Sequence, residues 1–181
     1  MCIRDRISPT RSFIDNNWIL KAYCDSDYSG DKDTRRSVTG YVIFIQDVPV
    51  SWKSRGQKSV TLSSTEAEYV ALSEVCMEIM FVKQLLEFIG MIIKKPIVIN
   101  VDNVGAIYLA TNTASTGRTR HIDTRYHYVR EYVMNGEVEV VFVRSQDNTA
   151  DLLTKNLPKE EFEKHAGVLV DDIEELMRKE K

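Results

Sequence analysis

Hydrophobic and polar positions in the first third of the chain form short runs, a pattern typical of β-strands. Runs rich in apolar and β-branched residues cover positions 18–24, 38–45 and 50–53. Asp47-Val48-Pro49 separates the second run from the third and is predicted to form a turn. We therefore expect three consecutive strands, most simply an antiparallel meander.

The pattern changes to helical spacing after Ser63. Ser63 and Glu66 match a capping box, in which a hydroxyl and a carboxylate three residues later satisfy free N–H groups at a helix start. Apolar residues then recur at helical spacing as far as Ile89, and Gly90 suits the end of a helix. This segment predicts one long helix.

The second half of the chain alternates between strands and helices. The continuous apolar run at residues 97–101 predicts a buried central strand, and residues 137–143 predict another. Shorter helices are expected at residues 103–110, 120–134 and 149–155. This order of elements predicts an α/β fold, with helices packed on a mixed sheet.

The chain is expected to contain one globular domain, at residues 16–158. Residues 1–15 have no periodicity and are expected to be disordered or non-native, and residues 159–181 to form a charged helical tail. No run of eighteen apolar residues and no secretory signal occur, so we expect an intracellular protein without a membrane span. Three cysteines with unrelated spacing argue against a disulfide framework or a zinc site.

The formal net charge of -3 is not that of a protein that binds nucleic acid over its whole surface. Basic residues nevertheless gather around positions 32–36, 53–58 and 118–120. Such patches either guide a polyanion or are solvated loops, and composition does not decide between the two.

Four acidic residues fall where the predicted elements begin or end. Asp25 ends the first strand, Glu68 lies in the first two turns of the long helix, Asp102 follows the central strand, and Asp151 opens the last short helix. Sites in such sheets collect at the carboxyl ends of strands. Carboxylates that met there would repel one another unless cations lay between them, and Mg²⁺ prefers such oxygen ligands. The sequence therefore predicts a divalent-metal site.

Each of these acids also has an ordinary structural explanation. Asp25 alone is most often a turn former, and Glu68 and Asp151 are favourable near helix N-termini. Asp102 is harder to explain in this way because it follows five apolar residues. Glu66 is accounted for by the capping box, so Glu68 is the preferred ligand.

Six segments of the chain form a recognisable pattern: AYCDSDYSGD at 22–31, SWKS at 51–54, LSSTEAEY at 62–69, DN at 102–103, RHIDTRYH at 120–127 and ADLLTK at 150–155. Together they resemble the ribonuclease H region of Ty1/copia-type retrotransposon polyproteins. The resemblance covers about residues 20–164. It implies a ribonuclease H-like fold with a five-stranded mixed sheet, and it places the four metal-binding acids on Asp25, Glu68, Asp102 and Asp151.

The resemblance also implies an activity and partners. The expected reaction is hydrolysis of the RNA strand of an RNA–DNA hybrid with two Mg²⁺ ions, for which Mn²⁺ could substitute, and with Asp25 as the bridging ligand. The expected partners are the hybrid and the reverse transcriptase domain of the same polyprotein. Substrate contacts are expected from Lys53, Arg55, Lys58, Arg118, Arg120 and His121.

Several alternatives stay open at this point. His121 is more simply a structural residue at a helix start, and Trp52 is expected to pack in the sheet rather than to stack on bases. The whole domain could be a non-catalytic or partner-dependent nucleic-acid-binding fragment. A transferase of the integrase kind shares the sheet and the carboxylates but needs a zinc-binding segment, for which the sequence has no pattern.

Overall fold

A five-stranded mixed sheet forms the centre of the molecule. The computed structural model describes residues 17–30, 33–112 and 123–169. The sheet has the order β4-β3-β2-β6-β7. Its strands are β2 (Leu20–Asp27), β3 (Val38–Ile45), β4 (Val48–Gly56), β6 (Ile97–Val101) and β7 (Val138–Phe142). β2, β3 and β4 form the antiparallel meander, and β6 and β7 continue the sheet in parallel with β2, which confirms the predicted sheet.

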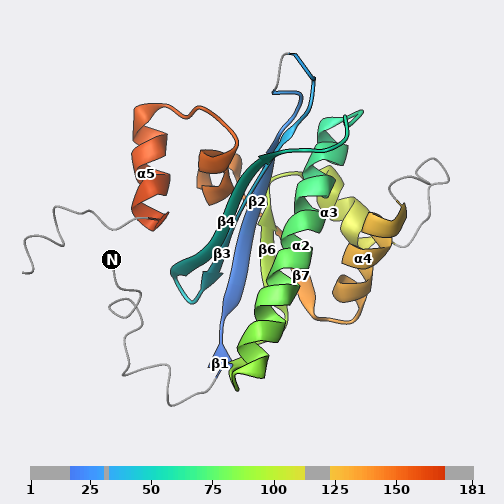
Figure 1. Ribbon diagram of the computed structural model, residues 1–181, viewed down its shortest axis with the longest axis vertical. Helices are drawn as coiled ribbons and strands as arrows, with labels where there is room; N and C mark the ends of the chain where they lie inside the picture. Colours follow the sequence, from blue (N-terminus) through green and yellow to red (C-terminus); the bar gives the residue numbers. More distant parts are fainter. Residues whose placement is uncertain (1–16, 31–32, 113–122, 170–181) are drawn as a thin grey trace, which may run out of the picture.

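Helices cover both faces of this sheet (Figure 1). α2 (Ser64–Phe88), α3 (Val104–Thr111) and α4 (Asp123–Met134) lie on one face. The 3₁₀ helix η3 (Thr149–Leu153) and α5 (Lys159–Leu169) lie on the other face, and η2 (Ser145–Asp147) precedes them. The main core lies between β2, β3 and β6 and the buried side of α2, because alternate residues of β2 (Leu20, Ala22 and Cys24) point toward that helix.

The caps of α2 agree with the sequence pattern. The Ser63 side chain accepts a hydrogen bond from the Glu66 backbone N–H at 3.1 Å. The Glu66 carboxylate accepts one in return from the Leu62 N–H at 2.7 Å, one residue earlier than a standard capping box. Gly90 follows the helix with φ of +87°, a conformation that favours glycine.

The predicted turn at Asp47-Val48-Pro49 is wrong. The register pairs Ile45 with Val48, so the two-residue turn consists of Gln46 and Asp47, and Gln46 adopts φ of +56°. Pro49 belongs instead to β4, which is an edge strand with a register irregularity at this point. An edge strand tolerates proline there because fewer of its N–H groups are needed for pairing.

Two further differences concern strands. β2 extends to Asp27, three residues beyond the predicted run, so Asp25 lies inside the strand. β1 (Asn17–Trp18) pairs in parallel with β5 (Ile92–Ile93), a two-stranded sheet that the sequence pattern does not predict.

The predicted C-terminal tail begins with a packed helix. α5 contacts η3, and its His165 is buried at 3% exposure. The segments 1–15 and 170–181 lie outside the described residues, so the predicted domain boundaries stay predictions. None of the described helices combines the length and the apolar character needed to cross a membrane.

Candidate metal centre

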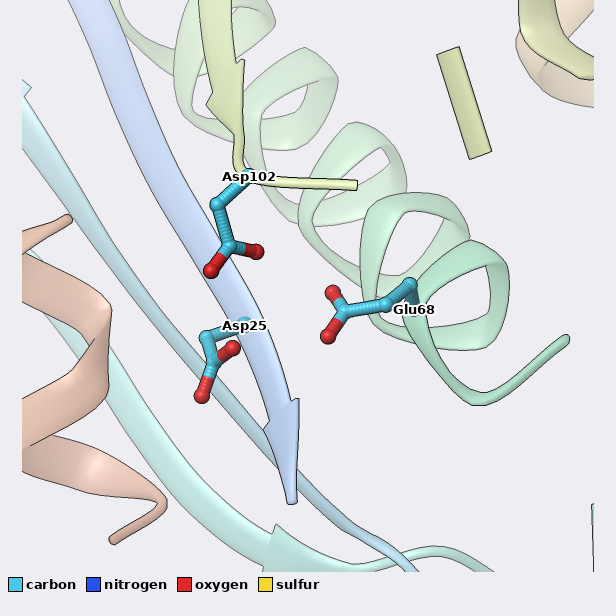
Figure 2. A group of neighbouring side chains, drawn as sticks. All are labelled: Asp25, Glu68 and Asp102. Atoms are coloured by element: carbon cyan, nitrogen blue, oxygen red, sulfur yellow. The ribbon is translucent and has the colours of Figure 1, made fainter. Parts of the chain in front are cut away.

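Three of the four predicted acids lie together at one edge of the central sheet. Asp25, Glu68 and Asp102 each offer a carboxylate oxygen, and these three atoms lie within 4.8 Å of one another. Figure 2 shows the three side chains converging from β2, from α2 and from the end of β6.

The sheet topology brings these residues together. β2 and β6 run parallel and stay paired as far as Cys24 and Val101. β6 ends there, whereas β2 continues with Asp25, so Asp25 and Asp102 are neighbours at the carboxyl ends of adjacent parallel strands. The second turn of α2 places Glu68 beside them, where its Oε1 accepts a hydrogen bond from the Ser26 N–H at 3.2 Å.

Burial and like charge dominate the electrostatics of Glu68. The residue is 6% exposed, and its Oε2 has no hydrogen-bond partner among the described residues. Burial, followed by the charges of Asp25 and Asp102, raises the pKa of Glu68 to about 9. Without a cation, the folded site therefore favours the protonated form of this carboxyl.

Asp151, the fourth predicted acid, lies outside the compact group and is joined to it through a lysine. Its Oδ2 lies 3.3 Å from the Lys155 Nζ, which also lies 3.1 Å from Asp25 Oδ1. Burial and the charge of Asp25 raise the pKa of Asp151 to about 6, and Lys155 opposes this shift. Asp151 Oδ1 is buried without a hydrogen-bond partner among the described residues.

Uncharged side chains fix the positions of these acids. Ser145 Oγ donates to Asp102 Oδ2 at 2.7 Å, and Thr154 Oγ1 donates to Asp25 Oδ2. Asn148 is fully buried, where its Nδ2 donates to the Cys24 carbonyl at 3.0 Å and its Oδ1 accepts from the Ala150 N–H at 3.2 Å. Asn148 thereby ties η3, and with it Asp151, to the central strand.

The donor set fits a hard divalent cation. It consists of carboxylate oxygens, two of which are buried and unpartnered, on Glu68 and Asp151. Mg²⁺ prefers such ligands, and a divalent charge would offset both the burial and the like charge that raise the pKa values of Glu68 and Asp151. Among the described residues, no histidine or cysteine belongs to this ligand group, which argues against zinc.

The predicted substrate contacts are only partly described. Lys53 Nζ lies 3.0 Å from Glu74 Oε2 on α2 and is therefore already ion-paired, whereas Arg55 and Lys58 are exposed. Arg118, Arg120 and His121 lie outside the described residues. Trp52 lies in β4, as a sheet residue should, but at 64% exposure it is not part of the core.

Sequence reasoning missed the residues that hold the acids in place, namely Ser145, Asn148, Thr154 and Lys155. Lys155 lies four residues after Asp151, a spacing at which side chains meet on a helical turn. The four-residue spacing in the sequence could therefore have predicted the ion pair between Lys155 and Asp151. Nothing local in the sequence links Asn148 to Cys24 or Ser145 to Asp102.

Comparisons with known proteins agree with this arrangement. The chain is 41% identical over 152 residues to the retrovirus-related Pol polyprotein from transposon RE1 of Arabidopsis thaliana, and 42% identical over 145 residues to that from transposon TNT 1-94 of Nicotiana tabacum. The matches cover 84% and 80% of this chain. Its fold matches that of LC11-RNase H1, isolated from compost by a metagenomic approach, with a TM-score of 0.56 at 16% identity, over 82% of this chain and 98% of that one. This chain is a ribonuclease H-fold homologue of Ty1/copia-type Pol polyproteins.

Further matches define the extent of this relationship. The ribonuclease H1 of Halobacterium salinarum NRC-1 gives a TM-score of 0.53 at 18% identity, over 75% of this chain and 93% of that one. No protein-family model matches the chain. The ribonuclease H-like chain spans about a tenth of the length of the Pol polyproteins, 10% of the RE1 protein and 11% of the TNT 1-94 protein.

Proposed function

We propose that this domain is an endoribonuclease that hydrolyses the RNA strand of RNA–DNA hybrids during retrotransposon reverse transcription, with two bound Mg²⁺ ions. The observation that carries the proposal is the convergence of Asp25, Glu68 and Asp102 within 4.8 Å at the carboxyl ends of two parallel strands. Relatives that are Pol polyproteins support the biological setting, and a solved LC11-RNase H1 bound to an RNA/DNA hybrid supports the substrate class.

The residues that would hold the ions are Asp25, Glu68, Asp102 and Asp151. Divalent ions at this position supply Lewis-acid charge and lower the pKa of bound water, which suits hydrolysis of a phosphodiester. Asp25 is grouped with Glu68 and Asp102 on one side, and on the other side it shares the ammonium group of Lys155 with Asp151. This central position favours Asp25 as the shared ligand.

The surrounding residues orient the ligands before substrate arrives. The Ser26 N–H holds one oxygen of Glu68, Ser145 holds one oxygen of Asp102, and Thr154 holds one oxygen of Asp25. Ligands fixed in this way lose little conformational entropy when they bind a cation, and they keep their geometry during the reaction.

Recognition of the hybrid would use general features of the duplex. Hydrogen bonds to 2′-hydroxyl groups in the shallow minor groove distinguish RNA from DNA, and phosphate contacts position the duplex without reading its sequence. Arg55, near the end of β4, and Lys58, just after it, are both exposed and are candidates for such phosphate contacts. Lys53 could contribute only if it left Glu74.

An exposed apolar stripe supports a partner within the polyprotein. Met77, Phe81, Leu85 and Phe88 recur every three or four residues along α2 and are 46%, 62%, 52% and 88% exposed. Side chains at this spacing share one helix face. The reverse transcriptase domain is the partner we propose for this stripe. The activity of the isolated domain would then depend on how much affinity for the hybrid that partner contributes.

Cleavage of a labelled RNA–DNA hybrid in Mg²⁺, with and without chelator, tests the proposal beside single-stranded and double-stranded controls. Asp102→Asn should reduce the rate at least about hundredfold, because even outer partners of metal ligands contribute about 10- to 100-fold. Asp47→Asn makes the same chemical change on an exposed acid that pairs with Lys21, and it should leave the rate unchanged.

The outcomes separate the two candidate functions. Nearly full hybrid cleavage by Asp102→Asn would show that the assigned site is wrong. Tight hybrid binding without cleavage by the wild type, alone and with the polymerase domain present, would favour the non-catalytic alternative.

A further inference from the structure

The ammonium group of Lys155 lies between two of the buried acids of the metal centre, Asp25 and Asp151. Its Nζ lies 3.1 Å from Asp25 Oδ1 and 3.3 Å from Asp151 Oδ2. The two carboxylates are deeply buried, with side-chain exposures of 1% and 9%, whereas the lysine side chain is 35% exposed. The lysine therefore places a positive charge between two acids that burial would otherwise leave unneutralised.

The same contacts engage both oxygens of Asp25. Oδ1 receives the Lys155 ammonium, and Oδ2 accepts the hydrogen bond from Thr154 Oγ1. A divalent ion bound by Asp25 and Asp151 would need these carboxylate oxygens and would repel an ammonium group a few ångströms away. The lysine and the ion therefore compete for the same ligands and for the same negative charge.

We propose that Lys155 is an exchangeable internal counter-ion, whose ammonium neutralises Asp25 and Asp151 in the metal-free protein and leaves them when a divalent cation binds. The inference rests on the proposed metal centre and adds a role for a residue outside the set of acids.

The chemistry of lysine suits such an exchange. Its ammonium is a compact point charge on a flexible four-carbon chain, and one third of the side chain already reaches solvent. The group can therefore move into water without unfolding η3. The bound ammonium stabilises the metal-free domain. It also lowers the apparent affinity for the divalent ion, because the ion must first displace this positive charge.

Isothermal titration with Mg²⁺ and with Mn²⁺ measures this competition directly and needs no catalytic turnover. Lys155→Met removes the charge while keeping the side-chain length, and it should bind each ion at least about tenfold more tightly. Lys155→Arg keeps the charge and should stay within about threefold of the wild type. Lys159→Met, which makes the same charge change four residues away on an 85% exposed side chain, is the matched control and should also stay within about threefold.

Thermal unfolding provides the second half of the test. In chelator, Lys155→Met should unfold at a lower temperature than Lys159→Met, because it leaves Asp25 and Asp151 without a cation. Saturating Mg²⁺ should then raise its unfolding temperature more than that of the wild type. Unchanged or weaker ion binding by Lys155→Met would overturn the proposal and leave Lys155 as a structural ion-pairing residue.

A measurement on the wild type covers the case in which Lys155→Met does not fold. The NMR signal of the Lys155 side-chain ammonium, assigned by its absence in Lys155→Arg, should change on addition of Mg²⁺ as the group moves to solvent. A signal that stays unchanged while the ion binds would contradict the exchange.

These readouts are independent of the nuclease assay. A wild type that binds Mg²⁺ but does not cut hybrids refutes the proposed activity and leaves the test of Lys155 intact. A wild type that cuts hybrids, with a Lys155→Met variant of unchanged ion affinity, refutes only the role of Lys155. A wild type that binds no divalent ion refutes both.

Discussion

The metal-free domain is expected to lose stability as the pH rises, and Glu68 is the cause. Its buried carboxyl has a pKa of about 9 in the folded protein, against an ordinary value of 4.5. Between these two values the folded protein holds a proton that the unfolded chain has released. The free energy of unfolding therefore falls with rising pH by up to about 1.4 kcal/mol per pH unit, from about pH 4.5 to about pH 9.

The size of the effect is large enough to measure. Between pH 6.5 and pH 8.5, the release of the Glu68 proton, whose pKa in the folded protein is about 9, should lower the free energy of unfolding by about 2–3 kcal/mol. Glu68→Gln keeps the shape of the side chain and removes the titration, so its stability should lack this part of the pH dependence. Subtracting the two curves cancels every contribution to the pH dependence that the two proteins share.

Urea unfolding in chelator at several pH values supplies both curves. Glu66→Gln, two residues away in the cap of α2, is the matched control and should follow the slope of the wild type. Saturating Mg²⁺ should flatten the wild-type curve, because a cation favours the ionised carboxylate. Parallel wild-type and Glu68→Gln curves in chelator would refute the reasoning about burial and like charge.

Two further predictions concern the packing that supports the centre. In Gly40→Ala the new Cβ would lie 2.5 Å from Thr154 Cγ2 and 3.1 Å from the Ala150 carbonyl oxygen, so η3 must shift. Denaturant unfolding should show a free energy of unfolding lower by about 1–3 kcal/mol. Gly56→Ala, whose new Cβ would have nothing within 4 Å, is the control and should show no such loss. Asn148→Ala removes both the cap of η3 and the hydrogen bond to the Cys24 carbonyl, and by the same assay it should lower the free energy of unfolding by about 2 kcal/mol. Asn103→Ala removes only the cap of α3 and should cost roughly half as much. Equal costs would count against the role of Asn148 in holding η3 against β2.

Local patterns in the sequence determined the order of elements and the three acids that meet. Strand and helix periodicities are properties of neighbouring residues, so β3, β6 and the capped start of α2 followed from the sequence with little error. Asp25 and Asp102 were identifiable because parallel strands bring their carboxyl ends to one edge of a sheet.

The tertiary structure alone decided how these residues are paired. Register placed the turn at Gln46 and Asp47, because pairing across strands, rather than the position of proline, fixes where a hairpin closes. Likewise, only the packing of η3 against β2 showed that Lys155 lies between Asp25 and Asp151. Asp25 and Lys155 are 130 positions apart in the chain, and no periodic pattern in the sequence encodes contacts over such a separation.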